Sequence, residues 1–279
     1  MITLAEAKVG MRDKVDQQVI DEFRRASFLL DQLVFDNAVS PTGGGSTLVY
    51  GYVQLLSPST VAVRTINSEY TPGEAKRTEK TAKIVPFGGS FQVDRVLAGT
   101  SGAIDEIQFQ LQEKIKAASN YFHNLVINGT AAASGAGFVV NTFDGLNKLL
   151  AGKDTEITST VDLSTSALLD ANYNAFLDEV DSFIAQLDGK PSLLLMNEKM
   201  LTKMRAIARR AGYYTREENS FGVPVEKYNN IPMIDAGKYY NGSSTVDVIP
   251  VTAATSVKEA TTDIYAVSIG LNGFHGISP

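Results

Sequence analysis

The sequence contains no cysteine and only two histidines in 279 residues. Without cysteine the chain can form no disulfide, no thiolate nucleophile, no iron–sulfur cluster and no cysteine-based zinc site. The histidines, His123 and His275, lie about 150 residues apart. His123 stands beside Phe122, where a structural role is more common than a catalytic one, and His275 has no acidic or nucleophilic neighbour in sequence. Most types of catalytic centre are therefore unavailable, and we expect no catalytic residues.

Other features that the sequence lacks exclude further classes. There is no apolar run of about 18 residues and no basic, apolar signal peptide at the start, so we expect no membrane partner and a chain that stays in the cytosol where it is made. The net charge of −6 argues against a dedicated nucleic-acid binder. No Walker loop, Gly-x-Ser-x-Gly elbow or His-Glu-x-x-His helix occurs, and residues 43–45 are three glycines without the lysine of a phosphate-binding loop.

A calcium site and other cofactors are not expected either. Residues 170–181 begin like an EF-hand loop, but Ala175 replaces the required glycine and Asp181 replaces the final glutamate. The same stretch has the apolar spacing of a helix. We therefore predict no metal site and no bound cofactor. The 44% hydrophobic content is nevertheless sufficient for a folded core.

A charged stretch between two strand patterns is the most informative part of the sequence. Residues 48–56 and 61–66 have strand patterns around a turn at 57–59, and residues 68–80 then contain almost no apolar side chains. A stretch of this kind has nothing to bury against its own domain, so we expect it to be disordered or to lie on another subunit. The charged residues proposed for contacts between subunits are Glu69, Glu74, Lys76, Arg77, Glu79, Lys80 and Lys83.

The spacing of apolar residues predicts a long helix over 102–128, with Ser101 as its N-cap and Asn128-Gly129 as its end. Its apolar face contains Ile104, Ile107, Leu111, Ile115, Ala118, Phe122, Leu125 and Val126. A helix of this length is roughly 35 Å long and would cross the whole molecule.

The remaining patterns predict an N-terminal helix over 14–35 and a mixed α/β region in the second half. That region contains a short helix at 143–150, an amphipathic helix capped by Ser164 or Thr165, a buried strand at 192–196, and a helix over 198–211 capped by Asn197. Short strands are predicted at 223–228, 231–235, 246–251 and 264–269.

Basic residues concentrate on and after the predicted helix 198–211. Three of them, Arg205, Arg209 and Arg210, are candidates for contacts with acidic patches of a neighbouring subunit, or with DNA through nonspecific phosphate contacts. The alternative is a solvated helix face, because cations are favoured near a helix C-terminus. The sequence leaves these alternatives open.

This order of parts resembles the major capsid proteins of tailed bacteriophages with the HK97-type fold. Three groups of residues carry the resemblance. The first, Pro86–Phe91 with Val93–Leu97, is similar to the returning limb of an extended loop. The others are Met196-Asn197 at the start of a helix, and Phe221–Val225 followed by Asn230–Ile234. The likeness spans most of the chain and rests on the order of these motifs.

The resemblance implies an α+β fold in five parts. These are an N-terminal helical arm (1–45), strands and an extended β-hairpin loop (46–100, with its tip at about 68–90), a spine helix and linker in the peripheral domain (101–140), a mixed α/β axial domain (141–262), and a C-terminal strand returning toward the peripheral domain (263–279). It further implies pentamers and hexamers that close into an icosahedral head around the phage genome.

The implied partners are other copies of the chain, a portal, possibly a decoration protein, and packaged DNA through nonspecific contacts. No long helical leader precedes the arm, which implies a separate scaffolding protein or a leader that has been removed. The C-terminus ends soon after a strand pattern, where a missing tail is an alternative. Two other functions remain open: an encapsulin-like nanocompartment with the same fold, and a cytosolic α/β hydrolase or transferase.

Overall fold

The computed structural model describes residues 29, 32–36, 48–96, 106–135, 137–187, 189–212, 216–218, 224–253 and 260–277. Most of the predicted N-terminal helix, the glycines at 43–45, the Ser101 cap and residues 221–223 lie outside this part of the chain. The chain forms two compact units, which are described separately. The larger contains Phe87–His275 with the N-terminal residues up to Val34, and the smaller contains Phe35–Pro86 and Gly276–Pro279.

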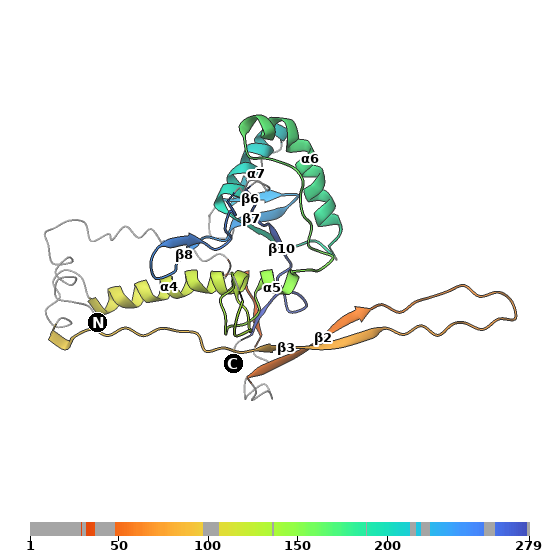
Figure 1. The fold of residues 1–279 in the computed structure, drawn as a ribbon, viewed down its shortest axis with the longest axis horizontal. Coiled ribbons are helices and arrows are strands. Elements are labelled where there is room, and N and C mark those ends of the chain that lie inside the picture. The colour runs from red at the N-terminus through yellow and green to blue at the C-terminus, as the bar shows by residue number, and fades with distance from the viewer. Residues whose placement is uncertain are drawn as a thin grey trace. The chain divides into compact units, whose positions relative to one another are not determined.

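A five-stranded mixed sheet forms the centre of the larger unit (Figure 1). Its strands lie in the order β10 (Tyr265–Val267), β4 (Leu193–Met196), β7 (Ile231–Asp235), β6 (Pro224–Tyr228) and β5 (Arg216–Glu218). Strands β4 and β7 are parallel, and the other neighbours are antiparallel. Within the described residues, the strand predictions at 192–196, 223–228 and 231–235 are therefore confirmed, and the strand predicted at 264–269 is shorter.

Strand β4 is buried on both faces and separates two hydrophobic cores. Because side chains alternate along a strand, Leu194 and Met196 pack into the core beneath the helices α6 (Ser166–Ala185) and α7 (Glu198–Ala211). Leu193 and Leu195 pack on the opposite face, against the end of helix α4 (Glu106–Asn128) and the short helix α5 (Leu146–Leu150). The continuous apolar run at 193–196 thus results from covering both faces of the sheet.

The predicted caps of α6 and α7 are confirmed. The hydroxyl of Thr165 accepts a hydrogen bond from the backbone N–H of Leu168 at 3.2 Å, and the Asn197 Oδ1 accepts one from the N–H of Lys199 at 2.8 Å. Helix α7 ends at Gly212, which adopts a left-handed conformation with φ of 78°. Residues 170–181, which begin like an EF-hand loop, lie within α6 and are helical.

Helix α4 confirms the predicted spine helix over its described length, but only one end of its apolar face is buried. Leu125, Val126 and Ile127 near its C-terminus are at most 4% exposed. Near its N-terminus, Ile107 and Leu111 are 47% and 49% exposed, respectively. The apolar face of the helix is thus divided into a buried C-terminal part and a half-exposed N-terminal part.

A small hairpin of β8 (Lys238–Tyr240) and β9 (Thr245–Asp247) completes the larger unit. The strand predicted at 246–251 is wrong beyond Asp247. The following residues Val248 and Ile249 are buried, but they do not pair as a strand. Their apolar character reflects burial in the core near α4 rather than strand structure.

The smaller unit consists of the hairpin of β2 (Val49–Ser57) and β3 (Lys76–Lys83), together with the two-residue parallel pair β1 (Phe35–Asp36) and β11 (Gly276–Ile277). One prediction fails here, because residues 61–66 form no strand. Of the two alternatives for the charged stretch 68–80, disorder is excluded for residues 76–80, which pair with β2 as part of β3. Contact with another subunit stays a prediction. The tip of the hairpin lies at 58–75, not at 68–90.

Candidate assembly surfaces

The β2–β3 hairpin carries the charged residues proposed for contacts between subunits. Five of them lie on β3 and are exposed: Lys76, Arg77, Glu79, Lys80 and Lys83. Glu69 and Glu74 lie in the connection at 58–75 and are also exposed. The structure thus brings all seven into one hairpin, on one strand and its adjoining tip.

Strand β2 opposes these charges with apolar side chains. Val53 faces Glu79 and Leu55 faces Arg77, and residues opposite each other in an antiparallel pair share a face. Val53 and Leu55 are 65% and 59% exposed. Leu56, the extra residue of a β-bulge, is also exposed. The hairpin therefore has one apolar and one charged strand, and neither is covered by the described residues of the chain.

The tip of the hairpin exposes further apolar residues although it is locally ordered. The Ser59 hydroxyl donates to the carbonyl of Gly73 at 3.0 Å, which joins the two limbs. A Cβ at Gly73 would collide with the side chain and backbone of Thr60, so this close approach requires glycine. Nevertheless Val61 is 97% and Val63 101% exposed. Neither side chain is buried by the part of the chain that the structure describes.

A second apolar surface runs along the first half of α4. Ile107, Leu111 and Ile115 follow each other at four-residue steps on one side of the helix, and each is about half exposed. The sequence predicted their helical periodicity, and the structure confirms it. Periodicity identifies an apolar face but does not identify whether the same chain or another copy covers it.

The basic residues of α7 are largely engaged within the chain. The Arg205 Nε donates to both carboxylate oxygens of Glu226 at 2.7 Å, and Arg210 forms an ion pair with Asp170 of α6. Lys203 donates to the backbone carbonyls of residues 163 and 164. Arg209 is exposed and has no ion-pair or hydrogen-bond partner among the described residues. Of the three predicted arginines, only Arg209 is thus uncommitted within that part of the chain.

The acidic partner Glu226 is one of the few buried charged residues. Its side chain is only 5% exposed, whereas that of Arg205 is 41% exposed. A carboxylate in such a position requires a positive partner, because an isolated buried charge is costly. The pair fixes helix α7 onto strand β6, and Arg205 therefore has a structural role in this unit.

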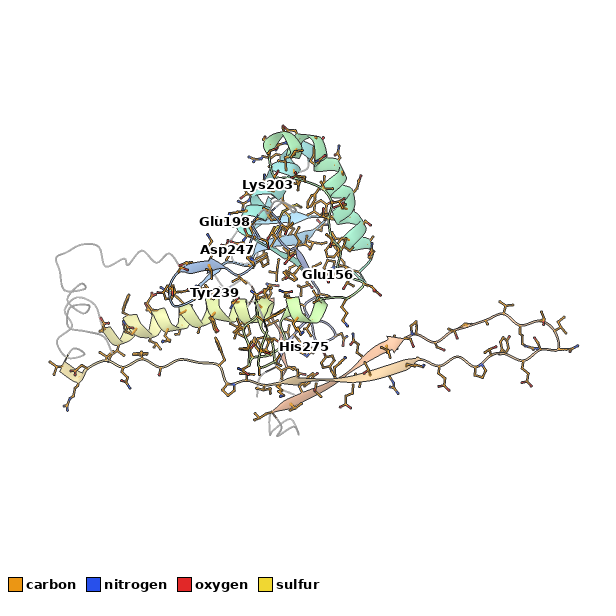
Figure 2. All side chains as sticks on the ribbon, in the orientation of Figure 1. Glu156, Glu198, Lys203, Tyr239, Asp247 and His275 are labelled. Carbon is orange, nitrogen blue, oxygen red and sulfur yellow. The ribbon has the colours of Figure 1, made fainter. Side chains whose placement is uncertain are left out.

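A row of polar side chains connects α4 to the rest of the larger unit. The Asn128 side-chain amide donates to the Val248 carbonyl at 2.8 Å and to the Asn124 side chain at 2.9 Å. About one turn before Asn124, the ring of Tyr121 packs against Tyr239 of β8, whose side chain lies beside α4 in Figure 2. These contacts hold the buried half of the spine helix.

His123 belongs to the same connection. Burial lowers the pKa of its imidazole below the ordinary value of 6.5, and a hydrogen bond with the backbone of Ala236 partly opposes this shift. The ring is therefore favoured in its neutral form, which agrees with the structural role expected from the sequence. The Nδ1 of His275 lies 3.1 Å from the Gly273 carbonyl oxygen, to which it donates in the tautomer that carries the proton there.

Among the described residues, no helix has the length and apolar content needed to span a membrane. The same part of the chain brings no three acidic or histidine side chains together in a group able to hold a metal ion. What the described surface offers instead is extended apolar and charged contact area.

This combination of an extended hairpin, a long helix and a mixed α/β unit occurs in known structures. The holo-SrpI encapsulin complex from Synechococcus elongatus PCC 7942 has a similar structure, with a TM-score of 0.58 and 14% identity over 99% of this chain and 78% of that chain. A structure from Mycobacterium phage Bobi matches with a TM-score of 0.50 and 11% identity over 89% and 78% of the two chains. The chain therefore has the α+β fold of the HK97-type capsid and encapsulin proteins.

The particular family follows from the amino-acid pattern. The pattern of the family described as SU10 major capsid protein matches residues 71–231, which is more than half of the chain, and the chain belongs to this family. No curated protein sequence matches it. It is a structural component of the phage head and not an enzyme, as the resemblance predicted. The family also decides between this function and the encapsulin-like and enzymatic alternatives.

Proposed function

We propose that the chain assembles the head through a contact in which the β2–β3 hairpin of one copy lies across helix α4 of a neighbouring copy. The observation that carries this proposal is the apolar exposure of the hairpin. Val61, Val63 and Ile66 are each more than 90% exposed, and a two-stranded hairpin on its own is at best marginally stable in water. A contiguous exposed apolar surface of this kind is typical of an interaction site.

The exposed half of α4 is the surface that suits this hairpin. Its stripe of Ile107, Leu111 and Ile115 is apolar and accessible, and burying an aliphatic side chain contributes about 1.5–3 kcal/mol when the burial is complete. The charged residues of β3 would then surround the apolar contact. Exposed ion pairs contribute only about 0–1 kcal/mol each, so they would select the partner while the apolar residues supply most of the adhesion.

The parts of the chain are assigned by the likeness to HK97-type proteins. We infer an N-terminal arm over 1–45, strands and hairpin over 46–100, a spine helix and linker of the peripheral domain over 101–140, and an axial domain from 141. Because β10 pairs with β4, the axial sheet includes residues up to Val267, and the returning C-terminal segment begins after it. The hairpin tip is taken as 58–75.

Copies joined in this head-to-tail manner form closed rings, and we infer the pentamers and hexamers of an icosahedral shell. A separate scaffolding protein, a portal and a decoration protein are the further partners that such a head would use, with packaged DNA in nonspecific contact. Particle size provides the first test. Light scattering and negative-stain microscopy should show shells or isolated rings, and a compact monomer at every concentration, with scaffold present, would contradict assembly by this chain.

The hairpin contact itself can be tested by cross-linking, because the chain contains no cysteine. The variants V63C and L111C are prepared separately, mixed before assembly, and treated with a short bis-maleimide. We expect a covalent dimer in the mixture and little in either variant alone. The matched control replaces L111C with A171C, an exposed position on α6. Equal dimer yields with both partners would show that the hairpin does not lie on α4.

A further inference from the structure

We propose that the outer face of α6 in one copy docks against the outer face of α7 in the next copy of the same ring. This inference rests on the proposed ring assembly and specifies a contact within it. The occupant of each face is thus a second copy of this chain. The observation is a separation of charge between two helices that cover the same side of one sheet.

The two helices have opposite charge. Helix α6 contains four carboxylates and no basic residue: Asp170, Asp178, Glu179 and Asp181. Helix α7 contains one carboxylate and five basic residues: Lys199, Lys203, Arg205, Arg209 and Arg210. Only one ion pair, between Asp170 and Arg210, joins the helices within the described residues. The opposite charges therefore do not serve mainly to attach the helices to each other.

Several of the remaining charges already have partners in the chain. Glu179 accepts from Ser159 and Asp181 accepts from the Tyr228 hydroxyl, while Arg205 and Lys203 are engaged as described above. Among the described residues, Asp178 of α6 and Arg209 of α7 are exposed without a hydrogen-bond or ion-pair partner. The side chain of Lys199 on α7 is likewise exposed without such a partner in this part of the chain. Charges of both signs are therefore available to another copy, and the two signs lie on different helices.

The side chains around these charges are complementary in size. The exposed residues beside Asp178 on α6 are small, including Ala171, Ala175 and Ala185. The exposed residues of α7 include the long side chains of Lys199 and Arg209. Small residues on a helix allow close approach, and a long cationic side chain can lie along them and reach the carboxylate.

The placement of the helices favours a ring. Figure 1 shows α6 and α7 next to each other on the α/β unit, with α7 on the left and α6 on the right in this view, so that their outer flanks face away from each other; the labels of Glu198 and Lys203 in Figure 2 mark the course of α7. Contacts of α6 with α6, or of α7 with α7, would bring like charges together. Only the head-to-tail contact is attractive, and a repeated head-to-tail contact closes into a ring when the rotation between copies permits.

The test uses two charge reversals, D178K and R209E, in the full chain. We expect each variant to fold with the circular dichroism spectrum of the parent. Each should raise the protein concentration needed for ring or shell formation by about fivefold to tenfold, as expected for an exposed pair turned repulsive. Mixing the two variants should restore hexamers, because the lysine introduced at position 178 of one copy then meets the glutamate introduced at position 209 of the next.

Matched controls are D154K and K153E, which make the same charge changes at exposed positions of the loop after α5. These should assemble like the parent. The mixing step separates a contact between copies from one within a chain, since a contact within a chain would be restored only in the double variant D178K/R209E.

The proposal is overturned if both reversals assemble at the parental concentration, or if only the double variant is restored. It is also overturned if R209E assembles normally and loses bound DNA, which would place α7 against the genome. All three results leave the proposed shell assembly intact. Failure of the parent chain to assemble would instead contradict the proposed function.

Discussion

Removing Arg205 should destabilise the chain far more than removing Arg209, although the two arginines lie one turn apart on the same helix. Arg205 is bound through its Nε to both oxygens of Glu226, whereas Arg209 has no partner among the described residues. The substitution R205A removes the guanidinium that binds both oxygens of a carboxylate that is only 5% exposed. The substitution R209A removes a side chain from the surface.

The expected magnitude follows from the exposure of the two partners. Breaking a fully buried ion pair by removing one partner costs about 3–5 kcal/mol. The Arg205 side chain is 41% exposed, so water can enter the vacated space and solvate part of the carboxylate. We therefore expect R205A to lower the free energy of unfolding by about 2 kcal/mol, less than for a fully buried pair. The cost of R209A should stay within about 0.5 kcal/mol, as for most surface substitutions.

Urea denaturation of the unassembled chain, followed by circular dichroism, measures the difference. With a urea dependence of about 2–3 kcal/mol per molar, R205A should lower the midpoint by roughly 0.7–1 M. The double variant R205A/E226Q should recover part of this loss, because a neutral amide is less costly to bury than a carboxylate that has lost its arginine. Equal midpoints for R205A and R209A would refute the assignment of a structural role to Arg205.

Three further predictions concern the connections of α4 and α7. The variant N197A loses both the cap of α7 and the 2.6 Å hydrogen bond to the Ile249 carbonyl, and its free energy of unfolding, measured by urea denaturation, should be lower by about 2–3 kcal/mol. In G129A, the new Cβ would lie 2.5 Å from the Phe143 carbonyl oxygen, so the melting temperature should fall by several degrees, and an unchanged value would contradict this close approach. Burial lowers the pKa of His123, so the contribution of its neutral form to the free energy of unfolding is complete above about pH 6.5 and is lost as the pH falls below that value. In H123Q, the free energy of unfolding should therefore decline less between about pH 7 and 5 than in the parent.

The sequence was sufficient to predict elements whose signals are local. The caps at Thr165 and Asn197 and the buried run at 193–196 each depend on a few neighbouring residues, and the structure confirms them. The order of these elements along the chain was enough to indicate the capsid fold. The sheet order β10-β4-β7-β6-β5 was not predicted, because strand pairing depends on contacts between distant segments.

The incorrect predictions concern residues whose environment is set by contacts with distant segments or other subunits, which neighbouring residues in the sequence do not reveal. Val61 and Val63 resemble a strand but are exposed, and the charged residues 76–83 resemble a loop but form β3. In a subunit whose surface is covered by neighbouring subunits, an apolar residue can be buried in the assembly and exposed in the monomer. Its apolar side chain therefore does not show that it belongs to the core of the monomer. Among the candidate contact residues, the ion pair of Arg205 with Glu226 could not be predicted from charge alone.

The division of the hairpin into an apolar and a charged strand has a consequence for the newly made subunit. Exposed apolar strands tend to pair with one another and aggregate, and charged residues, lysine above all, oppose such pairing. Strand β3 places Lys83, Glu79 and Arg77 directly opposite Val49, Val53 and Leu55. The charges of β3 therefore oppose pairing between the exposed hairpins of free subunits, so that the apolar residues of β2 stay accessible for the contact proposed above.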